Sequence, residues 1–261
     1  MRAGPPAGIV VPAGVRAVAG ARPLRAVWKN ELGGITFDAG DWFIKWTPAT
    51  SPIDPEAEQR RLEWASAFAR VPAVVDHGRD AEGAWLVTRA LPGASAVDDR
   101  WIADPARAVA AIGAGLRALH DALPVASCPF SWSVADRLAD IGRRAAAGAV
   151  RSDRWHPDHA AYDLERALAA VANPPPIDRL VVCHGDTCAP NTLLDARGGF
   201  AGHVDLGALG VADRWADLAI ATWSTRWNYG SGWEDGVLEA YGIARDEERT
   251  RYYRLLWDLG P

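Results

Sequence analysis

The sequence predicts an α+β protein with two lobes: an N-terminal antiparallel sheet with one inserted helix, then a mainly helical C-terminal lobe. Short runs of apolar and β-branched residues alternate with turns over the first 90 positions, and later stretches repeat apolar residues every three to four positions. The pattern changes at Leu91, Pro92 and Gly93, which favour a turn. We therefore expect an N-terminal lobe at 1–92 and a C-terminal lobe at 93–261.

The N-terminal lobe should hold five strands and one helix. A turn at 39–41 connects the second and third strands as a hairpin. The helix is expected over Asp54–Arg70, because apolar residues recur at helical spacing after a start signal and Pro72 ends the run. The strands are expected at Leu24–Trp28, Ile35–Asp38, Trp42–Trp46, Ala73–Asp76 and Ala84–Ala90.

The C-terminal lobe should be built mainly from helices, with three short strands between them. Three consecutive prolines after Asn173 break the helical pattern in the middle of the lobe. Helices are expected at Asp104–Leu123, Asp136–Ala149, Asp158–Ala172, Asp213–Trp223 and Trp233–Tyr241. Strands are expected at Leu180–Cys183, Thr192–Leu194 and Phe200–Val204.

Composition excludes several classes of function. The formal net charge is −5, and residues 93–261 carry 23 acidic against 17 basic side chains, so we expect no nucleic-acid partner but possible attraction of a polycation. No stretch approaches 18 uncharged apolar residues, so no membrane segment or secretory signal is expected. Three cysteines without metal-ligand spacing favour a reducing, cytoplasmic setting.

The densest chemical signal is His184-Gly185-Asp186, followed by Asn191 and then by Asp205. An apolar strand ends in the loop that carries Asp186 and Asn191, and a later strand ends near Asp205, so three oxygen-bearing side chains can converge. Mg²⁺ prefers such hard oxygen ligands, and a remaining carboxylate could act on a hydroxyl. Each residue alone could be a turn or cap residue. Their joint spacing favours a nucleotide-bound magnesium site.

At these residues the sequence resembles the aminoglycoside phosphotransferases, antibiotic kinases with a protein-kinase-like fold, and in particular the branch that modifies the 3′ or 3″ hydroxyl. The resemblance runs from about Trp28 onward and includes the residue pair Leu119-His120 and the stretch 204–219. It implies that Asp186 is the catalytic base or orienting carboxylate, that Asn191 and Asp205 hold magnesium, and that His184 supports the loop.

The resemblance also implies the reaction. The protein would use ATP, with GTP as an alternative, and Mg²⁺ to phosphorylate an aminoglycoside hydroxyl and so confer resistance. The first expected acceptor is the 3′-hydroxyl of kanamycin- and neomycin-type drugs. Streptomycin 3″ phosphorylation, a related amino-sugar kinase and a nucleotide-binding pseudokinase are the alternatives. A two-carboxylate hydrolase is disfavoured because it leaves Lys45 and Asn191 without roles. The protein is expected to be cytoplasmic, as a monomer or homodimer.

Lys45 is one of only two lysines and lies in an apolar strand, where an unpaired ammonium is costly to bury. We expect Glu58 to pair with it and hold it toward the nucleotide phosphates, with Glu56 as the competing partner. An edge-strand lysine that reaches solvent is the alternative. The resemblance places a glycine-containing flap over the phosphates at Gly33 and Gly34, for which a plain hairpin turn is the alternative. It also implies that a hinge at about 88–93 contacts the base through backbone groups of Arg89 and Leu91.

Acids of the C-terminal lobe are the candidates for binding the ammonium groups of the substrate, although most acids of this kind are solvated helix faces. Asp213 and Asp217 instead look structural, at a helix start. By the resemblance, Ala208 stands where relatives commonly carry arginine, and 257–261 departs from their usual ending; both departures concern the identity of the drug more than the reaction type. The candidate substrate acids are Asp153, Asp158, Glu234 and Asp258, with Asp163 and Asp235 as further possibilities.

Overall fold

A computed structural model describes residues 8–260. These residues divide into two compact units, and the first contains the chain up to Gly93 together with Ala201–Gly207. The second contains Ala94–Phe200 and the chain from Ala208 onward. A single cut in the sequence cannot describe this division, because Ala201–Gly207 returns to the first unit. The predicted α+β class is confirmed, with an antiparallel sheet in the first unit and a mainly helical second unit.

The first unit is built on a five-stranded sheet in the order β1-β2-β3-β5-β4, and every neighbouring pair is antiparallel. Helix α2 (Pro55–Ala65) is inserted between β3 and β4. It starts at Asp54, whose side chain accepts a hydrogen bond from the Glu56 amide, and it ends before the predicted residue 70. The strands are β1 (Arg25–Lys29), β2 (Ile35–Asp38), β3 (Trp42–Pro48), β4 (Val74–Arg79) and β5 (Gly83–Arg89).

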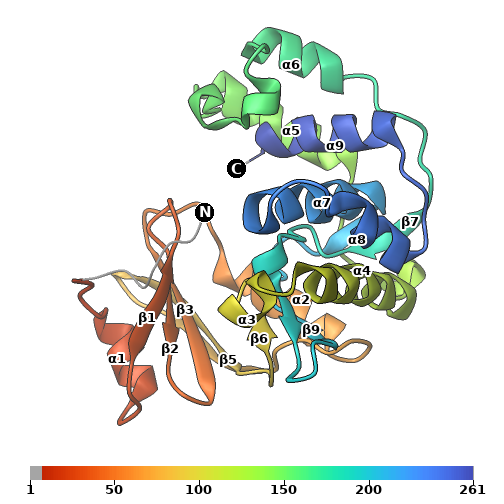
Figure 1. Ribbon diagram of the computed structural model, residues 1–261. Helices are drawn as coiled ribbons and strands as arrows, with labels where there is room; N and C mark the ends of the chain where they lie inside the picture. Colours follow the sequence, from red (N-terminus) through yellow and green to blue (C-terminus); the bar gives the residue numbers. More distant parts are fainter. Residues whose placement is uncertain (1–7, 261) are drawn as a thin grey trace. The chain divides into compact units, whose positions relative to one another are not determined.

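Helix α1 (Ala13–Ala19), which the sequence analysis did not predict, lies beside the sheet of the first unit (Figure 1). Its Val15 and Ala19 are fully buried in a cluster with Phe37, Ile44 and Val87. The helix is only two turns long and contains a glycine, so its periodic signal is weak. Packing against the sheet, rather than helix propensity, therefore stabilises it.

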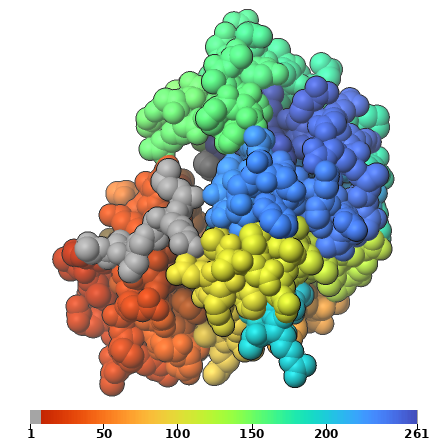
Figure 2. Space-filling view, viewed as in Figure 1, coloured from red at the N-terminus to blue at the C-terminus, as the bar shows by residue number. Residues whose placement is uncertain are grey.

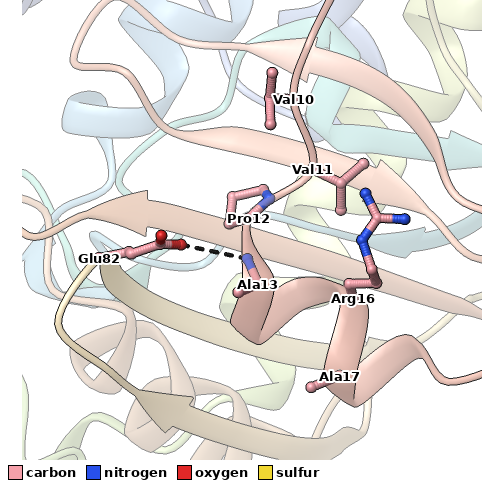
Figure 3. Close-up of a pocket in the computed structure, with 7 residues that line it drawn as sticks. All are labelled: Val10, Val11, Pro12, Ala13, Arg16, Ala17 and Glu82. Atoms are coloured by element: carbon pink, nitrogen blue, oxygen red, sulfur yellow. Dashed lines mark hydrogen bonds between the residues drawn. The ribbon is translucent and has the colours of Figure 1, made fainter.

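A pocket lies at the start of α1 (Figure 3). The Glu82 carboxylate accepts a hydrogen bond from the Ala13 amide at 3.3 Å and so caps the helix from the β4–β5 turn. None of the predicted site residues lines this pocket. The lining residues are Val10, Val11, Pro12, Ala13, Arg16, Ala17 and Glu82.

The second unit contains two short antiparallel strand pairs among its helices. Strand β7 (Leu180–Cys183) pairs with β10 (Gly210–Asp213), and β6 (Ala94–Ser95) pairs with β8 (Thr192–Leu194), while β9 (Phe200–His203) leads the chain back to the first unit. Among residues 8–260, no helix is both long and apolar enough to cross a membrane. The helices are α3 (Asp99–Ile102), α4 (Pro105–Ala122), α5 (Val134–Ala146), α6 (Leu164–Val171), α7 (Trp215–Tyr229), α8 (Glu234–Tyr241) and α9 (Glu247–Asp258).

Two helix predictions in the second unit were wrong in extent. The expected helix at Asp158–Ala172 is a 3₁₀ turn at Pro157–His159 followed by α6, because the Asp163 side chain caps a new helix start. The helix expected to end at Trp223 continues to Tyr229 and ends at Gly230, which has a φ of 90°. Trp223 is fully buried, whereas Trp227 keeps 36% of its surface exposed.

Helices α4 and α8 pack closely at Gly113. A Cβ atom at this position would lie 2.4 Å from the Val237 carbonyl oxygen and 2.7 Å from the Ala240 Cβ. We expect Gly113→Ala to lower the free energy of unfolding by about 1–3 kcal/mol, because backbone must move to admit the methyl group. Urea unfolding measures this change.

Gly142 in α5 is the matched control, because a Cβ there would meet nothing within 4 Å. Gly142→Ala should raise the free energy of unfolding by roughly 0.5–1 kcal/mol through helix propensity alone. Equal effects of the two substitutions would contradict the close α4–α8 contact.

Candidate active site

Lys45 lies between two carboxylates of the first unit. Its Nζ donates to both oxygens of Glu58, at 2.7 and 2.9 Å, and to Asp205 Oδ1 at 2.8 Å. Strand β3 brings the lysine, helix α2 brings Glu58, and Asp205 follows β9. Glu56, the competing partner, instead lies 3.5 Å from Arg79. The structure therefore pairs Lys45 with Glu58, and it adds Asp205 as a second partner.

Charge and burial act against each other in this cluster. Burial lowers the pKa of Lys45, but the nearby carboxylates of Asp205 and Glu58 outweigh it, so the pKa lies above its ordinary value. Burial raises the pKa of Glu58, and the attraction of Lys45 opposes that shift. The lysine consequently stays fully cationic near neutral pH.

Asp205 has an unusual backbone conformation. Its φ is 65°, and it is the single non-glycine residue with a positive φ within residues 8–260. Such a conformation is uncommon for residues other than glycine and costs energy, so surrounding contacts must hold it. Glu58 accepts a hydrogen bond from the Leu206 amide, the next residue along the chain. Glu58 therefore fixes both Lys45 and the backbone beside Asp205.

Phe43 is a residue of this face that the sequence analysis missed. It lies two positions before Lys45 in β3, so both side chains point to the same face of the sheet, and Phe43 is 36% exposed. The opposite face carries Ile44 and the buried core of the unit. Strand alternation could have identified an exposed aromatic ring beside the lysine.

The loop that carries Asp186 belongs to the second unit and is held by its own hydrogen bonds. The Asp186 amide donates to His184 Nδ1 at 3.2 Å, and the Cys188 amide donates to Asp186 Oδ1 at 3.4 Å. Asn191 Nδ2 donates to the Asp186 carbonyl at 3.0 Å. Because the Asn191 nitrogen is used inside the loop, its oxygen is the atom left for a cation. Such a hard oxygen is of the kind that Mg²⁺ prefers.

Asp217 on α7 anchors this loop. Its fully buried carboxylate accepts hydrogen bonds from the amides of His184 at 2.6 Å and Gly185 at 3.0 Å, and it lies 3.0 Å from His120 Nε2. Burial alone would raise the pKa of Asp217, but the hydrogen bonds, first of all that from His120, hold it below its ordinary value. The residue lies in the first turn of α7, as predicted, and it also holds the loop.

His120, Cys183 and Asp217 also place three potential metal-binding atoms within 4.8 Å of one another. Both nitrogens of His120 are engaged, with Asp217 and with the hydroxyl of Tyr241 at 2.8 Å. Cys183 Sγ donates to the Asp213 carbonyl, and burial raises the pKa of this thiol well above its usual value. The three groups therefore form a hydrogen-bonded core with a neutral thiol.

Ala208, at the position where the family resemblance implies an arginine, lies against the same loop. A Cβ atom at Gly185 would lie 2.4 Å from the Ala208 carbonyl oxygen, and Gly185 has a φ of +86°. Glycine is therefore required at 185 for both reasons. The altered residue 208 consequently borders the backbone that precedes Asp186.

Other expected nucleotide contacts have local structural roles. The Asn30 side chain accepts hydrogen bonds from the amides of Leu32 and Gly34, and Gly33 has a φ of +84°, so the two glycines belong to the β1–β2 hairpin turn. The Arg89 amide donates to the Ala73 carbonyl. The Arg89 amide is therefore already engaged within the sheet.

The predicted substrate acids differ in their surroundings. Asp153 is exposed and pairs with Arg151, whose nitrogens lie 2.9 and 2.7 Å from its two carboxylate oxygens. Asp158 and Glu234 both pair with Arg226, at 3.2 and 3.7 Å. The segment around residues 150–170, green in Figure 2, lies at the surface of the second unit. These three acids are paired with arginine and not simply solvated.

Asp258 is an exception among these acids. Only 10% of its side chain is exposed, and it accepts hydrogen bonds from His159 Nδ1 at 2.6 Å and from the His156 amide at 2.9 Å. The expectation that Asp258 contacts the substrate directly does not fit this geometry. Its carboxylate instead ties α9 to the 156–159 turn.

Comparison with known proteins shows consistent similarities. The family model described as "Phosphotransferase enzyme family" matches residues 21–253. An aminoglycoside 3′-phosphotransferase of Streptomyces fradiae is 38% identical over 219 residues, which cover 80% of this chain and 81% of the relative. A streptomycin 3″-kinase of Streptomyces griseus is 38% identical over 249 residues, which cover 87% and 89%.

Solved structures show the same similarity in three dimensions. An aminoglycoside-3′-phosphotransferase of type VIII superimposes with a TM-score of 0.78 at 31% identity, covering 94% of this chain and 97% of the other. Aminoglycoside phosphotransferase APH(3″)-Id from Streptomyces rimosus, in complex with ADP and streptomycin, gives 0.73 at 31% identity, covering 94% and 95%. Both share the fold that the sequence predicts.

Removal of the Asp217 carboxylate should destabilise the second unit strongly. We expect Asp217→Ala to lower the free energy of unfolding by about 3–5 kcal/mol at pH 7, since buried donors lose their acceptor. Asp153→Ala is the control, and it should leave the free energy of unfolding almost unchanged because the Arg151 pair is exposed. Chemical denaturation of both variants measures the difference.

The pH dependence follows from the lowered pKa of Asp217. A carboxyl whose folded pKa lies below its unfolded value of about 3.9 contributes stability that is present above that pH and is lost as the pH falls below it. The wild-type protein should therefore lose more stability in this acidic range than Asp217→Ala does. An equal loss of stability in the two proteins as the pH falls would contradict the lowered pKa of Asp217.

Proposed function

The chain belongs to the phosphotransferase enzyme family, and from this premise we propose that it transfers the γ-phosphoryl group of ATP to a hydroxyl of an aminoglycoside antibiotic and so confers resistance. The observation that carries the proposal is the Lys45 ammonium, held 2.7 Å from Glu58 and 2.8 Å from Asp205. A cation fixed in this way on a sheet suits the phosphates of a nucleotide. The related structure in complex with ADP and streptomycin supports both ligands.

In this proposal the first unit binds the nucleotide. Lys45 contacts the α- and β-phosphates, and Glu58 holds it in place because its carboxylate accepts two hydrogen bonds from the ammonium. Phe43 lies on the same face and offers an aromatic surface to the base. The backbone of Arg89 and Leu91 provides polar contacts to the base, with the Arg89 carbonyl as an acceptor.

Asn191 and Asp205 are the proposed magnesium ligands. A magnesium ion held there would neutralise charge on the phosphates. Asn191 is prepared for this role because its amide nitrogen is occupied by the Asp186 carbonyl. Asp205 is prepared because its backbone is fixed in the left-handed region.

Asp186 is the proposed orienting carboxylate for the acceptor hydroxyl. A new bond forms between the hydroxyl oxygen and the γ-phosphorus while the bond from that phosphorus to the ADP oxygen breaks, and the hydroxyl proton passes to Asp186. Little covalent work is required of the protein, so orientation and electrostatics dominate. The hydrogen bonds that fix the 184–191 loop therefore matter directly for the rate.

Asp158 and Glu234 are the proposed contacts for substrate ammonium groups. Both already pair with Arg226, so a polycationic drug would compete with an internal cation. The first candidate substrate is the 3′-hydroxyl of kanamycin- or neomycin-type drugs, supported by the 38% identical Streptomyces fradiae relative. Streptomycin 3″ phosphorylation is the second candidate, because the streptomycin 3″-kinase matches at the same identity over a longer stretch.

Substitutions should separate the acceptor and metal roles. Asp186→Ala should lower kcat by about 10²-fold or more and leave ATP affinity nearly unchanged, because the carboxylate is assigned to the hydroxyl. Asp205→Asn and Asn191→Ala should instead raise the Mg²⁺ concentration needed for half-maximal activity. Steady-state kinetics with Mg²⁺ titration measures both. Turnover of Asp186→Ala within a few-fold of wild type would exclude the assignment.

A drug panel tests the acceptor. Purified protein with ATP and Mg²⁺ should phosphorylate kanamycin but not kanamycin that lacks its 3′-hydroxyl, and mass spectrometry with NMR locates the phosphate. Turnover of streptomycin alone would move the assignment to the 3″-hydroxyl. The drug KM should rise with ionic strength more than the ATP KM, because carboxylates attract the polycation. ATP binding without turnover of any aminoglycoside would contradict the proposed substrate class.

A further inference from the structure

A chain of buried polar groups leads from α8 to the loop that carries Asp186. The Tyr241 hydroxyl lies 2.8 Å from His120 Nδ1, and His120 Nε2 lies 3.0 Å from Asp217 Oδ2. Asp217 in turn accepts hydrogen bonds from the backbone amides of His184 and Gly185, the two residues before Asp186. The side chains of His120 and Asp217 are 1% and 0% exposed, and Tyr241 is 1% exposed. Solvent therefore cannot replace any lost member easily.

The donors and acceptors of this chain fit one arrangement. The ionised carboxylate of Asp217 can only accept, so His120 carries a hydrogen on Nε2. In the neutral ring Nδ1 is then an acceptor, and the Tyr241 hydroxyl donates its hydrogen to it. Burial raises the pKa of Tyr241, so its hydroxyl remains a donor. The Tyr241 hydroxyl thus stabilises the tautomer of His120 that Asp217 requires.

We propose that Tyr241 and His120 are positioning residues for phosphoryl transfer, acting on Asp186 through Asp217 and the backbone of His184 and Gly185. The proposal rests on the proposed function in assigning Asp186 to the acceptor hydroxyl. Without the Tyr241 hydroxyl, His120 is free to adopt the other tautomer, which turns an unprotonated Nε2 toward the carboxylate. Asp217 then loses a donor, and the loop that it anchors can shift.

The effect should fall on the rate of the chemical step. Asp186 acts on the attacking hydroxyl, so a small displacement lowers transition-state stabilisation without changing contacts to the nucleotide. Lys45 and Glu58, proposed for the nucleotide, belong to the other unit and are not part of the chain. A loss of kcat with an unchanged ATP KM is therefore the signature of positioning.

Other charged or titratable side chains lie near His120, and a test substitution must leave them unchanged. Cys183 from β7 lies in the same cluster as a neutral thiol, and Arg117 of the same helix contacts the Tyr241 ring, 5.6 Å from its centre. Arg214 precedes α7 and is paired with Asp178 at 2.6 Å. Substitution of Tyr241 by phenylalanine leaves all four side chains in place and removes a single hydroxyl.

The test compares Tyr241→Phe with Tyr252→Phe. Tyr252 also has a buried hydroxyl, which donates to the Val171 carbonyl at 2.9 Å, but it has no contact with the 184–191 loop. Both variants lose one buried hydrogen bond, so both should show a small fall in melting temperature. Only Tyr241→Phe should lower kcat, by about fivefold, at an unchanged ATP KM. His120→Gln, which keeps a donor toward Asp217, should retain more activity than His120→Leu.

Amide hydrogen exchange provides a readout that needs no substrate. The amides of His184 and Gly185 should exchange faster in Tyr241→Phe than in Tyr252→Phe or wild type. Faster exchange in Tyr241→Phe, together with a wild-type protein that phosphorylates no aminoglycoside, would support the network and contradict the proposed function. Equal exchange in the two variants, or equal kcat, would overturn the positioning role of Tyr241.

Discussion

The buried carboxylate of Asp217 is the constraint on which the proposed catalytic loop depends. A charged group without solvent is tolerated only when donors surround it, and here two backbone amides and a histidine provide them. The hydrogen bonds that keep this carboxylate ionised also fix the backbone of the two residues before Asp186. The stability and the geometry of the loop therefore depend on the same hydrogen bonds. Helices α4 and α8, which carry His120 and Tyr241, contribute to the site together with the loop.

The first unit uses charge differently. One ammonium is shared by Glu58 and Asp205, which leaves one negative charge in excess around Lys45. Glu58 is nearly buried and bound to backbone, whereas the side chain of Asp205 is 49% exposed. In the proposed function, Asp205 is therefore the partner that would exchange its contact with the lysine for a cation that arrives with a nucleotide. Glu58 would keep Lys45 in place during such an exchange.

Sequence analysis identified a charged residue that needs a partner of opposite charge. It missed residues that hold other parts of the structure in place. Lys45 in an apolar strand required a carboxylate, which pointed to an acid of the following helix, and the choice of Glu58 over Glu56 came from its family-like spacing to Trp64. Asp205 as a second partner could not, because 160 residues separate it from Lys45 and its positive φ has no sequence signal outside glycine. Helix α1 was missed because packing against the sheet stabilises it, and Tyr241 was missed because an apolar helix face gives a tyrosine no distinguishing pattern.

The acids proposed for substrate show why composition predicts less than structure. An acidic excess suggests free carboxylates, yet Asp158 and Glu234 share Arg226 and Asp258 is engaged by two donors. A polyammonium drug therefore gains less from these carboxylates than their number suggests, since each contact first replaces an existing pair. Discrimination between drugs then depends on which ammonium groups can displace Arg226. Geometry at that arginine, and not total charge, would select the substrate.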